Sequence, residues 1–136
     1  MEKLNTLCII EDNDVTQFLL QQMVEETQMV KQVKLCSNGL RAIEYLRALQ
    51  DQPELLPEMI LLDLAMPVMD GWRFLEEYRK IKPQLGKSIT IYIVTSSIDP
   101  ADVQKAKTVS EVADFIVKPV TKSRFLDLVR ELKRVV

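Results

Sequence analysis

The residues best suited to chemistry in this chain stand at the ends of apolar stretches of strand length. They are Glu11 and Asp12 near the N-terminus, Asp63 in the middle, Thr95 further on and Lys118 towards the C-terminus. Three carboxylates crowded into one pocket repel one another and shift their pKa values unless a cation neutralises them. Magnesium suits such a pocket because it binds a few carboxylate oxygens and leaves its other positions to water and phosphate oxygens.

Each carboxylate of the set can be given a role in phosphoryl transfer. We expect Asp12 and Asp63 to bind Mg2+ directly and Glu11 to act through water. The backbone carbonyl of Ala65 is a further candidate ligand. Asp63 is also a competent nucleophile, since aspartate carboxylates form acyl phosphates. The lysine would stabilise charge on the transferred group while the threonine donates a hydrogen bond.

The elements that must position these residues alternate between strand and helix. Strand-like apolar runs cover residues 4–10, 33–35, 59–62, 89–94 and 115–117. Apolar residues at three- and four-residue spacing follow most runs and are predicted to form the buried helix faces: Val15, Phe18, Leu19 and Met23; Ala42, Ile43, Leu46 and Leu49; Trp72, Phe74, Leu75, Tyr78 and Ile81; Phe125, Leu128, Val129, Leu132 and Val136. The fourth helix, capped by Asp99 and ending near Val109, has the weakest apolar face.

Five strand–helix units predict a mostly parallel sheet with helices on both faces. Run 33–35 alternates polar and apolar residues as an edge strand does, whereas runs 4–10, 59–62 and 89–94 are nearly continuous. The predicted fold class is therefore α/β, a doubly wound, flavodoxin-like (βα)5 three-layer sandwich with strand order 2-1-3-4-5. Ligands of such sheets bind at the carboxyl ends of the strands, which places the chemical residues in one pocket.

Composition narrows the class of protein further. With 136 residues, 47% of them hydrophobic, we expect one domain over residues 1–136 and no output domain. A net charge of −2 gives no reason to expect nucleic-acid or membrane binding, and the opening residues fit neither a secretory signal nor a span. We expect a cytoplasmic protein in which Cys8 and Cys36 are buried reduced thiols. The absence of histidine excludes imidazole-based chemistry in this chain.

Taken together, the motifs resemble the receiver domains of two-component response regulators, in particular a stand-alone, chemotaxis-regulator-like receiver. The matching segments are IIEDN with Glu11 and Asp12, ILLDLAMPVMDG with Asp63, Pro67 and Gly71, IVTSS with Thr95, and FIVKP with Phe115, Lys118 and Pro119. The resemblance implies that Asp63 accepts a phosphoryl group, with Mg2+ bound, from a sensor histidine kinase or a histidine phosphotransfer protein. It does not imply an enzyme beyond catalysis of the domain's own phosphorylation and dephosphorylation.

The same resemblance implies how the signal would leave the domain. Thr95 and Phe115 would be switch residues that reshape the surface formed by the fourth helix, fifth strand and fifth helix. The Lys118–Pro119 peptide bond would be cis. The downstream target is an unidentified protein, and the domain would be a monomer or a phosphorylation-dependent dimer.

Some positions depart from the common pattern of the family. Ala65, Ser96 and Ser97 stand where attacking water would approach, so the lifetime of the phosphorylated state cannot be carried over from relatives. Two alternative functions stay open. One is a degenerate receiver that acts as an interaction module without phosphorylation. The other is an aspartate-nucleophile phosphohydrolase, which would need a second aspartate at the position of Ala65.

Overall fold

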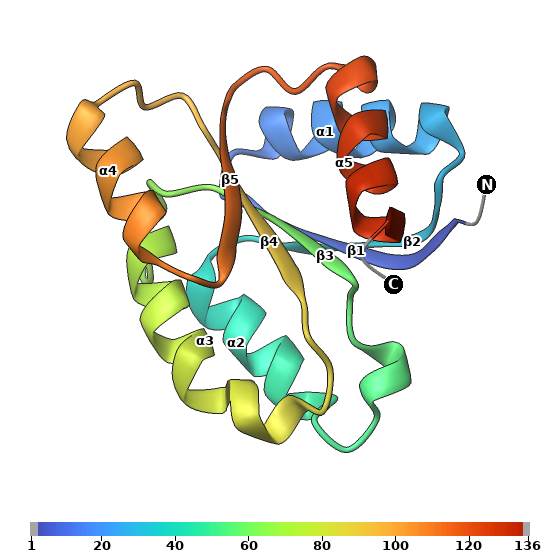
Figure 1. Ribbon diagram of the computed structural model, residues 1–136, viewed down its shortest axis with the longest axis vertical. Helices are drawn as coiled ribbons and strands as arrows, with labels where there is room; N and C mark the ends of the chain where they lie inside the picture. The colour runs from blue at the N-terminus through green and yellow to red at the C-terminus, as the bar shows by residue number, and fades with distance from the viewer. Residues whose placement is uncertain (1–2, 135–136) are drawn as a thin grey trace.

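The computed structural model describes residues 3–134, which form one five-stranded parallel sheet between two layers of helices (Figure 1). The strands are β1 (Leu4–Ile10), β2 (Val30–Cys36), β3 (Met59–Leu62), β4 (Thr90–Thr95) and β5 (Val112–Val117). The helices are α1 (Asp14–Thr27), α2 (Gly39–Ala48), α3 (Gly71–Leu85), α4 (Pro100–Thr108) and α5 (Lys122–Arg134), with a short 3-10 helix at Pro53–Leu55. The strand order β2-β1-β3-β4-β5 confirms the predicted topology and its edge strand.

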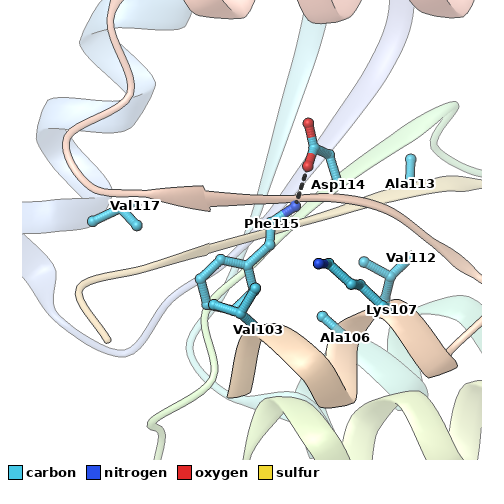
Figure 2. Close-up of a pocket in the computed structure, with 8 residues that line it drawn as sticks. All are labelled: Val103, Ala106, Lys107, Val112, Ala113, Asp114, Phe115 and Val117. Carbon is cyan, nitrogen blue, oxygen red and sulfur yellow. Dashed lines mark hydrogen bonds between the residues drawn. The ribbon is translucent and has the colours of Figure 1, made fainter. Parts of the chain in front are cut away.

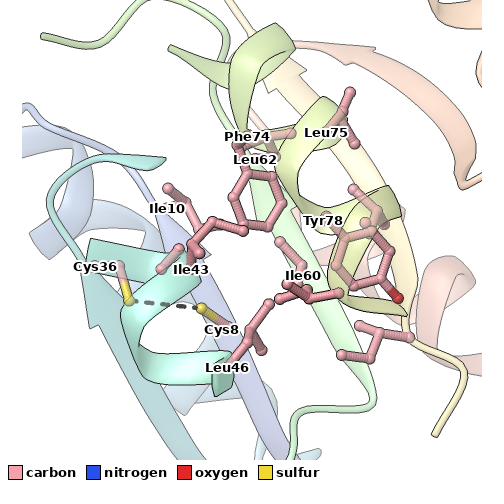
Figure 3. Packing of buried hydrophobic residues seen from close by; sticks show 14 of the residues in the cluster. Cys8, Ile10, Cys36, Ile43, Leu46, Ile60, Leu62, Phe74, Leu75 and Tyr78 are labelled. Atoms are coloured by element: carbon pink, nitrogen blue, oxygen red, sulfur yellow. Dashed lines mark hydrogen bonds between the residues drawn. The ribbon is translucent and has the colours of Figure 1, made fainter. Parts of the chain in front are cut away.

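Two apolar cores lie on opposite faces of the sheet because successive side chains of a strand point to opposite sides. On one face Cys8, Ile60 and Ile91 pack with α2 and α3, around the stacked rings of Phe74 and Tyr78 (Figure 3). Both cysteines are buried free thiols, as expected, and their Sγ atoms lie 3.9 Å apart.

The second core joins the other face of the sheet to α1 and α5. Leu7, Ile9 and Leu61 of the sheet contact Leu20 and Val24 of α1, and buried residues of α5 complete the cluster: Phe125, Leu128 and Val129. Figure 1 shows α1 and α5 together on this side. The helix stripe prediction for Val136 lies outside the described residues.

The prediction for the buried face of α1 is wrong. Val15, Phe18 and Leu19, which we name the α1 patch, are 66%, 63% and 57% exposed. Leu20 and Val24, one helical turn apart, face the sheet instead, with Met23 at the margin. The helix has two apolar stripes, and spacing alone does not tell which one meets the core.

Helix starts follow local sequence. Asn13 accepts the backbone N–H of Thr16 at 2.9 Å and caps α1. Asp70 caps α3 and Asp99 caps α4 in the same way, and the cap at Asp99 confirms the prediction for the fourth helix. Strand β5 is longer than expected because Val112 and Asp114 pair with Ile91 and Tyr92 of β4, and Ala113 lies between them at an irregularity of the ladder.

Candidate phosphoryl-transfer site

The carboxyl ends of β1, β3, β4 and β5 bring five of the predicted site residues together, and we name this site the acidic pocket. Glu11 and Asp12 follow β1, Asp63 follows β3, Thr95 ends β4 and Lys118 follows β5. Backbone hydrogen bonds fix the strand ends: the Asp63 N–H donates to Ile10 O at 3.0 Å, and the Lys118 N–H donates to Thr95 O at 2.9 Å. The pocket therefore follows from the strand order itself.

The three carboxylates converge closely. Glu11, Asp12 and Asp63 each offer one oxygen, and these atoms lie within 4.8 Å of one another. Glu11 and Asp63 are buried, whereas Asp12 is exposed at the mouth of the site. Such a cluster of hard oxygen donors, open to solvent on one side, fits Mg2+, which binds few protein carboxylates and retains water.

Lys118 connects the two buried carboxylates. Its Nζ donates to Glu11 Oε1 at 2.5 Å and to Asp63 Oδ2 at 3.4 Å. Desolvation by burial raises the pKa of Glu11, while the hydrogen bond from Lys118 opposes this shift. The ammonium thus partly offsets the repulsion among the acids.

Sequence reasoning missed several groups that orient these side chains. The backbone N–H of Leu64 donates to Asp63 Oδ1 at 2.8 Å and holds the carboxylate in one orientation. The Asn13 N–H donates to Glu11 Oε2 at 3.2 Å, and the Gln17 side chain donates to the Glu11 backbone carbonyl at 2.5 Å. A backbone donor leaves no signal in residue type, and the contact of the Gln17 side chain depends on where α1 places it, so only the fold reveals these groups.

The loop after β3 is closely packed against the backbone of Asp63. A Cβ atom at Gly71 would lie 2.5 Å from the backbone oxygen of Asp63, which no real side chain tolerates. The Gly71 N–H also donates to Leu64 O at 2.9 Å. Ala65 is exposed next to this contact, and Val68 further along the loop has a φ of 69°, in the left-handed region.

The residues predicted to act as switches lie in different surroundings. Thr95 is buried, and its Oγ1 accepts the backbone N–H of Ser97 at 3.3 Å. Phe115 is half-buried and lines a cavity of about 350 Å3 between α4 and β5, which Figure 2 shows with Val103 and Ala106 on its α4 side. The Lys118–Pro119 peptide bond is cis.

The comparisons with known proteins agree with this geometry. The family model of the response regulator receiver domain matches residues 7–130, and the chain belongs to this family. The probable methanogenesis regulatory protein FilR2 of Methanothrix harundinacea (strain 6Ac) is 26% identical over 95% of this chain and 79% of its own length. Signal transduction histidine-protein kinase BarA of Escherichia coli (strain K12) is 30% identical over 94% of this chain, which spans 13% of that protein.

Solved structures show the same fold. A two component response regulator from Cytophaga hutchinsonii superposes with a TM-score of 0.89 at 24% identity, covering 98% of this chain and 99% of that one. The receiver domain of a histidine kinase from Syntrophus aciditrophicus gives a TM-score of 0.77 at 28% identity, covering 97% and 92%. The predicted family and flavodoxin-like fold are thereby confirmed. Among residues 3–134, no helix is both long enough and apolar enough to cross a membrane.

Proposed function

We propose that Asp63 accepts a phosphoryl group and that residues 1–136 act as one receiver unit in two-component signalling. The observation that carries this proposal is the convergence of three carboxylate oxygens within 4.8 Å, with the Lys118 ammonium 3.4 Å from Asp63. A metal-binding acidic cluster beside a nucleophilic carboxylate and a fixed cation is what phosphoryl transfer to aspartate needs. Relatives that include a histidine kinase and response regulators support the same setting.

The donor set suits Mg2+. Asp12 and Asp63 would bind the ion directly, Glu11 through water, and the Ala65 carbonyl follows the acceptor closely enough in sequence to be a third protein ligand. When bound, the ion would neutralise charge on the oxygens of the transferred phosphoryl group.

The chain's own residues account for the remaining steps. An Asp63 oxygen forms a bond to phosphorus as the P–N bond of a phosphohistidine donor breaks, and the leaving nitrogen keeps the electron pair. The Leu64 N–H holds the carboxylate during this attack, and Lys118 stabilises the negative charge of the group. Thr95 then donates its hydroxyl proton in a hydrogen bond to a phosphoryl oxygen. Because the chain has no histidine, the donor is another protein or domain.

The surface beside the pocket supports a protein donor. The α1 patch is exposed, and a groove of about 280 Å3 runs next to it between Leu19, Leu20 and the residues after β5, Lys118, Pro119 and Val120. An apolar helix face of a sensor histidine kinase or histidine phosphotransfer protein would cover this patch while presenting its phosphohistidine to Asp63. We expect the domain to be cytoplasmic and to bind neither nucleic acid nor membrane.

The signal to a downstream protein would leave from the surface of α4, β5 and α5. Thr95 and Phe115 act as switch residues, and the surface of α4, β5 and α5 changes when Asp63 is phosphorylated. The signal then passes by contact to a downstream protein, with the domain acting as a monomer or as a phosphorylation-dependent dimer.

A labelling experiment tests the proposal. With acetyl phosphate and Mg2+ we expect one phosphoryl group per chain by intact mass, lost in Asp63→Asn and kept in Asp51→Asn, an exposed loop control. Labelling of Asp63→Asn at the wild-type level would refute the acceptor assignment. A wild-type chain that is never labelled would favour the degenerate receiver, and multiple turnover of a phosphomonoester would favour the phosphohydrolase.

A further inference from the structure

We propose that Ser97 and Asp102 are positioning residues that tie Thr95 to the first turn of α4. Through this tie, occupancy of the acidic pocket would be transmitted to α4. The inference rests on the proposed function, because it concerns the switch of the same site.

Ser97 is bonded on two sides. Its backbone N–H donates to Thr95 Oγ1 at 3.3 Å, and its own Oγ donates to Asp102 Oδ2 at 2.7 Å. The Asp99 N–H also donates to Ser97 Oγ at 3.3 Å. The side chain is half-buried, whereas its neighbours Ser96 and Ile98 are exposed. One residue therefore connects the switch hydroxyl to both the cap and the first turn of α4.

Helix α4 makes few buried contacts along the rest of its length. The hydrogen bond between Ser97 and Asp102 at its start can therefore influence its position strongly. Ala106 is its one buried residue, whereas α3 buries six. On the side facing β5, Figure 2 shows the open cavity lined by Val103, Ala106 and Phe115. On the other side Lys105 lies over the ring of Trp72 at 4.6 Å. Elements with few buried apolar contacts open and shift most readily.

The bonding of Thr95 shows how the tie would respond. The Thr95 backbone is fixed by the N–H of Lys118, so the strand end stays in place when the side chain turns. If Thr95 Oγ1 moves to a phosphoryl group on Asp63, the Ser97 N–H loses its acceptor and the loop over residues 96–99 is released on that side. Because Ser97 Oγ stays bonded to Asp102, the loop carries the first turn of α4 with it, next to the cavity that Phe115 lines.

Four single variants distinguish loss of the hydrogen bond between Ser97 and Asp102 from changes in side-chain size and charge. Ser97→Ala and Asp102→Ala remove the donor and the acceptor, whereas Ser97→Thr keeps a hydroxyl and Asp102→Asn keeps an acceptor oxygen. Amide hydrogen exchange is followed for α4 and for the loop after β3, with and without beryllium fluoride and Mg2+ as the phosphoryl analogue.

We expect beryllium fluoride to change exchange in both regions of the wild type. In Ser97→Ala and Asp102→Ala the loop after β3 should respond as before, while the α4 response falls to less than half. Without the analogue, α4 exchange should rise about two- to tenfold, the range for one hydrogen bond of ordinary strength. The threonine and asparagine variants should behave like the wild type, and the double alanine variant should be no worse than either single one.

Three results would overturn the inference: a full α4 response in Ser97→Ala, equal losses in the conservative variants, or additive effects in the double variant. A wild type in which neither region responds would count against the phosphoacceptor function instead. In that case amide hydrogen exchange measured without beryllium fluoride still tests the link from Ser97 to Asp102. Unchanged α4 exchange in both alanine variants rejects it, and equal, non-additive increases support it.

Discussion

At the scale of single residues, Glu111 is a carboxylate outside the acidic pocket that two basic side chains contact. Its side chain is 8% exposed, accepts from Arg79 at 2.8 Å and lies 3.6 Å from Lys82. The hydrogen bond from Arg79 is the main cause that lowers the pKa of Glu111 from its ordinary value of 4.5, against the opposing effect of desolvation. A lowered pKa in the folded state means that the ionised carboxylate stabilises the fold above about pH 4.5, and that this contribution is lost as the pH falls through the folded pKa.

We therefore expect Glu111→Gln to lower the free energy of unfolding at about pH 7 by roughly 1 kcal/mol or less, because Arg79 is largely exposed and solvent screens the pair. The difference from the wild type should shrink as the pH falls from about 7 towards about 3, because Glu111 loses its charge as the pH falls through its lowered folded-state pKa. Urea unfolding at both pH values measures it. Glu76→Gln, an exposed change on the helix that carries Arg79, is the control and should show little difference at either pH. A Glu111→Gln deficit that persists unchanged at low pH would contradict the ion-pair explanation.

Single residues of the acidic pocket could be predicted because their positions depend on strand ends and not on side-chain packing. Once runs 4–10 and 59–62 were identified, Glu11, Asp12 and Asp63 had to meet at the sheet edge. The bond between Ser97 and Asp102 could not be predicted, since it depends on the path of a loop. The same holds for the Leu64 N–H, because every residue except proline carries such a donor.

At the scale of elements, α1 carries two apolar stripes that lie in different surroundings. Leu20 and Val24 stabilise the fold against the sheet, whereas the α1 patch faces solvent beside the groove next to Pro119. Periodicity predicted the helix correctly but assigned the exposed stripe to the core. Both stripes satisfy the same spacing, and only the direction in which the chain enters α1 from β1 decides between them.

The α1 patch leads to a prediction about the phosphodonor. Phe18→Ala should slow phosphotransfer from a histidine kinase or phosphotransfer protein about tenfold or more, because an exposed aromatic anchor of an interface is lost. Labelling by acetyl phosphate should not change, since the small donor needs no docking surface. Leu40→Ala, an exposed apolar residue on α2 at the other face of the sheet, is the matched control. Equal slowing with both donors would show that Phe18 supports the pocket and is not part of a docking surface.

At the scale of the whole molecule, the proposed metal site would link stability to metal binding. The folded chain concentrates three carboxylates that the unfolded chain separates, so folding works against their repulsion and a divalent ion bound there would favour the folded state. The topology that brings the three carboxylates together, and so creates their repulsion, was predictable from the alternation of strands and helices. The balance between Lys118 and the acids was not, because it depends on distances of a few ångströms.

We expect Mg2+ in large excess to raise the free energy of unfolding by roughly 1 to 3 kcal/mol, the range for a ligand at tens to hundreds of times its Kd. Chelation should remove this gain. Asp12→Asn should reduce it strongly, whereas Asp14→Asn, an exposed change two residues further along at the first residue of α1, should not. Thermal unfolding with and without Mg2+ measures the effect. An equal gain in wild type and Asp12→Asn would place the ion elsewhere.

The contact between Gly71 and the Asp63 backbone has a consequence for how such a domain can change in evolution. Because a Cβ atom at position 71 would collide with the backbone of Asp63, the proposed acceptor, we expect one methyl group there to disturb the proposed phosphoryl-transfer function while every charged residue stays intact. A lineage could thus acquire an inactive copy through a position that looks chemically inert. Inspection of its acids, lysine and threonine alone would not distinguish that copy from a working domain.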